Sequence, residues 1–290
     1  MKWEGRRKSD NVKRSGGGAR GGGGRSFAGL GGGGLIIMLI LVLITGGNPL
    51  SILIGGSQMI QSENVGPYEP RNQEEAELEE FLSVVLADTE DVWHKIFKEN
   101  GATYREPTLV LYQNQVNTAC GAASSRMGPF YCGGDESVYI DVAFAKDLRT
   151  TFGAEGDFPF AYVLAHEVGH HVQKQTGALQ EVQSLHGRVS DVQYNNEMVK
   201  LELQADYYAG VVAHYIGKKG YLDPGDVEEG MAAAAGVGDD RIQEMQGGRA
   251  YPDTFQHGTS DQRQRWFLKG YKYGDLQNGD TFKVRNSKDL

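Results

Sequence analysis

The apolar side chains of this chain follow two different periods, and each period predicts a different kind of element. Three stretches repeat apolar residues at helical spacing, and two short runs are rich in β-branched and aromatic residues. The predicted helices cover residues 74–99, 156–173 and 197–216, and the predicted strands cover residues 107–113 and 138–141. Few strands among long helices predict an α+β fold, mainly helical, with a small antiparallel or mixed sheet.

Upstream of these elements lies a continuous apolar run, LIIMLILVLITGGNPLSILI, at residues 35–54. No charged residue occurs from Ser26 to Ser62, and a helix that spans a bilayer needs about 20 mainly apolar residues. A cleaved signal peptide is the alternative, but no Ala-x-Ala-like cleavage site follows the run. We therefore predict one transmembrane anchor at residues 35–54.

The residues before the apolar run are basic and rich in glycine. Residues 1–34 hold eight lysine or arginine residues against two acids, which gives this segment a net charge of +6. The whole chain has a net charge of −9, so residues 35–290 carry −15. We expect residues 1–34 to be a disordered tail, residues 55–73 a linker and residues 74–290 one domain. By the positive-inside rule, this predicts a single-pass protein of a bacterial cell membrane with a cytoplasmic N-terminus and an extracytoplasmic domain. The acidic domain argues against nucleic acid as a partner, although the basic tail could contact anionic lipid or RNA.

The chain contains two cysteines, Cys120 and Cys132. They are too few for a zinc finger built on Cys-x-x-Cys pairs. If the domain is exported, we expect them to form a disulfide. Closing a loop of this size stabilises the fold by roughly 3 kcal/mol.

The stretch AYVLAHEVGHHVQKQTG holds three of the seven histidines. His166 and His170 are four residues apart, so a helix places both on one face, where they can bind the same metal ion. Glu167 lies beside them, as in the H-E-x-x-H arrangement of two zinc ligands and a general base. Asp157 is the expected N-cap of this helix. His171 lies about 100° further around the helix, so we expect it to pack or form hydrogen bonds instead.

A catalytic zinc ion needs a third protein ligand. Glu202 and Asp206 lie four residues apart inside an apolar helix of small residues, where a like-charged pair requires compensation. We predict Glu202 as the third ligand and Asp206 as the acceptor of a histidine N–H. His186 is expected to be exposed, and His214 is about three turns away from Glu202.

Four segments resemble a known family. GDFPFAYVLAHEVGHHVQ, KLELQADYYAG, GDDRIQ and FQHGTSDQRQRWFLKGY together closely resemble the bacterial "putative neutral zinc metallopeptidase" family, over about residues 67–275. The resemblance implies a zincin-like fold of the gluzincin type. It also implies that His166, His170 and Glu202 bind one Zn²⁺, with Glu167 as base and Asp206 behind a histidine.

These observations predict a membrane-anchored zinc endopeptidase that hydrolyses peptide bonds with a zinc-activated water and a glutamate base. His257 is the candidate donor to the oxyanion, with Arg263 holding its turn, although a turn histidine without a catalytic part explains the pattern equally well. We expect a peptide or protein as substrate and the lipid bilayer as a partner through residues 35–54. The main alternative is a zinc-stabilised binding module without catalytic activity, and the presence of Glu167 favours the enzyme. The sequence leaves the oligomeric state open.

Overall fold

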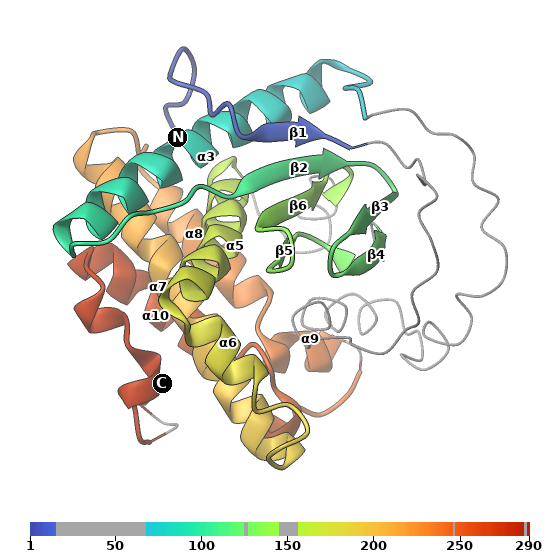
Figure 1. Cartoon of the computed structure of the whole chain (residues 1–290), viewed down its shortest axis with the longest axis vertical. Coiled ribbons are helices and arrows are strands. Elements are labelled where there is room, and N and C mark those ends of the chain that lie inside the picture. The colour runs from blue at the N-terminus through green and yellow to red at the C-terminus, as the bar shows by residue number, and fades with distance from the viewer. Residues whose placement is uncertain (16–67, 125–126, 145–155, 246, 287–288) are drawn as a thin grey trace, which may run out of the picture.

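The computed structural model shows helices and a small mixed sheet, as predicted (Figure 1). It describes residues 1–15, 68–124, 127–144, 156–245, 247–286 and 289–290. The helices are α3 (Gln73–Glu99), α5 (Phe158–Thr176), α6 (Ala178–Gln183), α7 (Asp191–Lys218), α8 (Asp226–Gly236), α9 (Asp239–Met245) and α10 (Ser260–Tyr273). The strands are β1 (Val12–Arg14), β2 (Thr108–Tyr112), β3 (Gln115–Thr118), β4 (Gly121–Ser124), β5 (Phe130–Cys132) and β6 (Ser137–Asp141). Short 3₁₀ turns occupy Pro252–Thr254, Gln277–Gly279 and Thr281–Lys283.

The main sheet has the strand order β1-β2-β6-β5. β2 pairs in parallel with both β1 and β6, whereas β5 pairs with β6 in antiparallel orientation. β3 and β4 form a separate antiparallel hairpin. A disulfide joins Cys120, in the hairpin turn, to Cys132 at the end of β5, so the predicted cysteine pair is confirmed.

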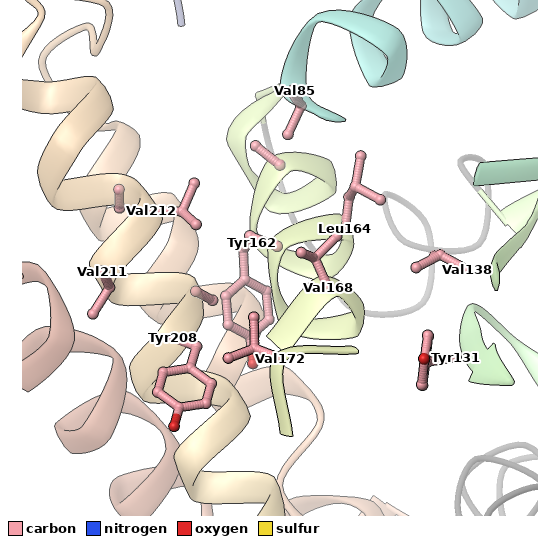
Figure 2. Close-up of a cluster of buried hydrophobic side chains, with 14 of the residues drawn as sticks. Val85, Tyr131, Val138, Tyr162, Leu164, Val168, Val172, Tyr208, Val211 and Val212 are labelled. Carbon is pink, nitrogen blue, oxygen red and sulfur yellow. The ribbon is translucent and has the colours of Figure 1, made fainter. Parts of the chain in front are cut away.

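The metal-site helix α5 lies between the sheet and α7 (Figure 1). Leu164 and Val168 point from α5 toward Val138 of β6, and Tyr162 points toward α7 (Figure 2). Val85 of α3 covers a further side of the same cluster. Apolar neighbours therefore surround α5 on several sides, and this packing fixes its position relative to the sheet and α7.

The predicted tail is wrong for residues 1–15. Val12, Lys13 and Arg14 form β1, in register with residues 109–111 of β2. The amino group of Met1 lies 2.6 Å from Oδ1 of Asp157. Composition alone suggested a solvated arm, but four cationic side chains of this segment, Arg6, Arg7, Lys8 and Arg14, form ion pairs with acidic residues of α3.

Two more predictions at the edges of the domain need correction. Asp157 does precede α5, but its side chain makes no capping hydrogen bond and contacts the Met1 amino group instead. The last part of the predicted linker belongs to the fold, because Tyr68 is buried and its N–H donates to the carbonyl oxygen of Ser15. The domain therefore includes residues 68–73.

The predicted anchor at residues 35–54 lies outside the described residues. Within the part of the chain that the structure describes, none of the helices combines the length and apolar character needed to cross a bilayer.

Candidate metal centre

The site is built where α5 and α7 cross at close range. A Cβ atom added to Gly169 of α5 would lie 3.2 Å from both the Cα and the carbonyl oxygen of Ala205 on α7. A side chain at position 169 would require the two helix backbones to shift apart by a few tenths of an ångström. The glycine inside the His-Glu-Val-Gly-His stretch therefore lets the two helices approach each other, and this brings their polar side chains together.

His166, His170 and Glu202 converge at this crossing. The Nε2 atom of His166 lies 3.2 Å from Oε2 of Glu202, and the Nε2 atom of His170 lies 3.4 Å from Oε1 of Glu202. One donor atom from each of the three residues falls within 4.8 Å of the others, and all three side chains are buried. The three predicted ligands are thus brought to one point from two helices.

Asp206 orients His166 and also forms hydrogen bonds with Tyr162 and Arg263. Its Oδ1 atom lies 2.8 Å from Nδ1 of His166 and accepts a hydrogen bond of 2.6 Å from the Tyr162 hydroxyl. Arg263 donates to both carboxylate oxygens, from Nε at 2.8 Å and from Nη2 at 3.0 Å. With the Nδ1 atom of His166 donating to Asp206, its Nε2 atom is directed at Glu202 and at the space beside it.

Gln173 performs the same task for His170. Its amide nitrogen donates to the Leu201 carbonyl at 2.6 Å and to Oε1 of Gln204 at 3.1 Å. These bonds fix the amide orientation, so the Gln173 oxygen accepts from Nδ1 of His170 at 2.8 Å. Both histidines therefore turn Nε2 toward Glu202, and this nitrogen can donate an electron pair to a metal ion once it is deprotonated.

The fit of this donor set to a metal ion rests on its chemistry and on two buried oxygens. Two imidazole nitrogens and a carboxylate are the ligands of the open His₂Glu type of zinc site. Oε1 of Glu202 and Oε2 of Glu167 are buried and have no hydrogen-bond partner among the described residues. Such atoms are costly unless a group beside them compensates, so these residues suit a divalent cation and a ligand bound to it.

The electrostatics of the site are strongly perturbed. Burial alone would lower the pKa of His166, but Asp206 and Glu202 raise it to about 10. Burial raises the pKa of Glu167. Asp206 has a lowered pKa, because the charges of Arg263 and His166 outweigh its burial. A buried cluster of shifted groups is typical of functional sites.

His257 lies beside this cluster and is buried. Its Nδ1 atom is 3.0 Å from Oδ1 of Asp239, while Oδ2 of Asp239 accepts the backbone N–H groups of residues 256, 257 and 258. Burial opposes the charged form of His257, but Asp239 and Glu202 raise its pKa. Burial likewise opposes the charge of Asp239, but His257 and these N–H groups lower its pKa. Asp239 thus fixes both the loop and the imidazole.

Three further histidines, His171, His186 and His214, were not predicted as metal ligands. His171 is buried away from the ligand set, with Nδ1 2.8 Å from the Tyr131 hydroxyl and Nε2 2.6 Å from the Arg105 carbonyl. His186 is exposed, and the Nδ1 atom of His214 lies 2.7 Å from the Tyr271 carbonyl oxygen.

One prediction for the site was incomplete. Arg263 does contact the chain near the His257 turn, at the Val237 carbonyl, but its main partner is Asp206.

Sequence reasoning missed Gln173, Tyr162 and the link from Asp239 to His257. Gln173 lies three residues after His170, and Tyr162 lies four residues before His166, so helical spacing could have identified both. Asp239 lies at the start of α9. Its partner His257 lies in a distant loop, so local sequence carries no sign of this link.

Taken together, the fold and the donor set define a candidate metal centre with two histidines and one glutamate, supported by a layer of hydrogen-bonding residues. The family model described as "Putative neutral zinc metallopeptidase" matches residues 1–282, so the chain belongs to this family.

Relatives match between 71% and 97% of the chain. The chain is 44% identical over 286 residues to the uncharacterized protein YpfJ of Escherichia coli, covering 97% of this chain and 99% of that protein. It is 41% identical over 220 residues to an uncharacterized protein of Mycobacterium bovis, covering 71% of this chain and 73% of the relative. No solved structure matches the chain.

Proposed function

We propose that this protein is a zinc-dependent endopeptidase that hydrolyses peptide bonds of a peptide or protein substrate. The observation that carries the proposal is the convergence of His166, His170 and Glu202 next to the buried carboxylate of Glu167. A site with a purely structural ion has no need of a carboxylate base beside its ligands. Membership of the family supports the choice of zinc.

Each residue of the candidate site has a separate role in the proposed reaction. His166, His170 and Glu202 would hold the zinc ion, which when bound acts as a Lewis acid and lowers the pKa of water. Glu167 takes a proton from the attacking water molecule and passes it to the amine nitrogen of the broken peptide bond. His257, held by Asp239, whose charge raises its pKa against the effect of burial, donates a hydrogen bond to the oxyanion that forms on the former carbonyl oxygen.

β5 is a suitable place for an extended substrate. It ends the sheet order, packs against α5, and has one edge without a partner strand in the part of the chain that the structure describes. We propose that the substrate adds to this edge as a further strand, because main-chain hydrogen bonds bind peptides of varied sequence. The disulfide stabilises this edge by tying β5 to the β3–β4 hairpin.

The same disulfide supports a location for the enzyme. Disulfides persist in oxidising compartments and are rare in the cytosol. We propose that the metallopeptidase domain lies outside the cytoplasm and associates with the membrane through the apolar residues 35–54.

The experiment is a comparison of the full-length protein with its Glu167→Gln variant. Both should bind one zinc ion per chain, and only the wild type should cleave members of a broad peptide library. An exposed glutamate in the next helix gives a matched control, since Glu181→Gln should retain both zinc and activity. Equal cleavage by wild type and Glu167→Gln would refute the assigned base. Zinc binding without cleavage by any of the three proteins would favour a binding module instead.

A further inference from the structure

A row of hydrogen bonds leads from His170 to a turn near the C-terminal end of the domain. The oxygen of Gln173 accepts from Nδ1 of His170 at 2.8 Å, and its amide nitrogen donates to Oε1 of Gln204 on α7 at 3.1 Å. The amide nitrogen of Gln204 in turn donates to the carbonyl oxygen of Gly279 at 3.1 Å. Gln173 is fully buried and Gln204 is 6% exposed, so water does not compete for these bonds.

Two backbone carbonyls fix the direction of every bond in this row. A carbonyl oxygen can only accept, so Gly279 requires the amide nitrogen of Gln204 to face it, and this turns the Gln204 oxygen toward Gln173. The Leu201 carbonyl, 2.6 Å away, requires the amide nitrogen of Gln173 in the same way. The Gln173 oxygen is therefore left facing His170, whose Nδ1 must carry a proton, so that Nε2 is the nitrogen that binds a metal ion.

The Gly279 carbonyl is itself held in place by the fold. A Cβ atom added to Gly279 would lie 2.5 Å from the ring of Tyr207 on α7, so a larger residue would displace the turn. Before Gly279, Asp275 accepts from the Tyr207 hydroxyl at 3.0 Å. After it, the Thr281 hydroxyl donates to the Lys200 carbonyl at 2.7 Å. The turn is thus attached to α7 on both sides of the carbonyl that orients Gln204.

A buried polar row of this kind needs a reason, because apolar side chains would fill the same space without the risk of unpaired groups. We propose that Gln204 is a positioning residue of the metal centre, and that through it the turn at Gln277–Gly279 holds His170 in the orientation that binds a metal ion. Gln204 acts on His170 through Gln173. The inference rests on the metal centre of the proposed function, but it does not depend on peptidase activity.

The first test compares two substitutions of Gln204 in the full-length protein. Gln204→Met keeps the volume and removes both bonds, so zinc affinity should fall about three- to tenfold, less than the roughly 10–100-fold typical of a residue bonded directly to a ligand. Gln204→Glu still accepts from Gln173, because a carboxylate offers an oxygen in either orientation. It should therefore retain at least the wild-type zinc affinity, although its second oxygen faces the Gly279 carbonyl and should lower the urea midpoint.

Zinc affinity is measured by competition with a chromophoric chelator, at a temperature at which every variant is folded. Thr281→Val is the matched control, because it removes a buried hydrogen bond between the same turn and α7 and leaves the row intact. It should lower the urea midpoint and leave zinc affinity unchanged. If zinc affinity falls in step with stability in all three variants, Gln204 has only a structural role and the proposal is wrong.

A double-mutant cycle tests whether Gln204 acts through Gln173. Gln173→Leu removes the bond to the ligand itself, so it should lose about tenfold or more in zinc affinity. Adding Gln204→Met to this variant should cause no further loss, because the row is already broken beside His170. Independent, additive losses would overturn the proposed route.

The cobalt-substituted protein gives a spectroscopic readout with an internal control. The ring Nδ1 protons of His166 and His170 should appear as two shifted resonances that disappear in D₂O. Gln204→Met should speed solvent exchange of the His170 proton, whereas the His166 proton, held by Asp206, should be unaffected. Equal exchange in wild type and variant would contradict the proposal. A protein that shows these effects but cleaves no peptide would refute the proposed function and leave this inference standing.

Discussion

Asp206→Asn is the most informative substitution in the metal centre, because Asp206 is bonded to three different side chains. Its carboxylate faces His166, Tyr162 and both donor nitrogens of Arg263. Asparagine has the same shape, but one of its two terminal atoms is an N–H donor. In either orientation that amide nitrogen faces at least one N–H of Arg263, and the buried guanidinium loses its counter-charge.

The expected magnitude follows from these contacts. Removing one partner of a buried ion pair costs about 3–5 kcal/mol, because the remaining charge stays desolvated. Loss of the carboxylate behind a liganding histidine typically weakens metal binding about 10–100-fold. We therefore expect Asp206→Asn to lose at least about 3 kcal/mol of stability and about tenfold or more in zinc affinity.

Two measurements check this prediction: urea unfolding of the metal-free protein and competition for zinc with a chromophoric chelator. Asp275→Asn is the matched control, because Asp275 is partly exposed and accepts from the Tyr207 hydroxyl at 3.0 Å away from the ligand set. We expect this control to lose about 1 kcal/mol and no zinc affinity. If Asp206→Asn behaves like the control in both assays, the orienting role of Asp206 is wrong.

Three further predictions concern the fold around the site. Gly270→Ala places a Cβ atom 2.0 Å from a backbone oxygen of α7, so this clash should outweigh the helix propensity gain of about 1 kcal/mol and lower stability by about 3 kcal/mol. Gly217→Ala, whose nearest contacts are side-chain atoms, should change stability by less than about 1 kcal/mol, and similar melting of the two variants would contradict the reasoning. Asp239→Asn should reduce the melting temperature most near neutral pH. The stabilisation from Asp239 is lost as pH falls through its lowered pKa, and that from His257 is lost as pH rises through its raised pKa, so a pH-independent difference would argue against the ion pair. Deletion of residues 1–15 exposes the edge of β2 and should lower the melting temperature by roughly 10 °C, whereas unchanged melting would mean that β1 does not stabilise the domain.

Three helices, α3, α5 and α7, were predictable because their cause is local. Apolar spacing predicted residues 74–99, and α3 covers Gln73–Glu99, with Asn72 as N-cap and Gly101 in the left-handed region at its end. The spacing of His166 and His170 fixed their common face for the same reason. Glu202 was identifiable because an acidic pair within an apolar helix needs a partner.

The contacts between distant segments could not be predicted in this way. Whether Asp157 caps α5 or binds the Met1 amino group depends on where the N-terminus lies, and only the packed sheet determines that. Arg263 was assigned to a nearby turn, but the α7–α10 crossing brings it to Asp206. The predicted transmembrane anchor and localisation stay predictions, since residues 35–54 lie outside the described residues.

By itself, the sequence predicted three of the helices, two strands of the sheet, and the candidate ligand and base residues that the fold brings together, because each depends on spacing within one element or on the charge of a short segment. Only the tertiary structure decided which groups orient those ligands and where the first fifteen residues belong. The physical reason is that ion pairs and strand pairing act through space. Arg6 and Asp88 are far apart along the chain, yet they form an ion pair in the fold, and a basic segment that composition describes as a solvated tail becomes the edge strand of the sheet.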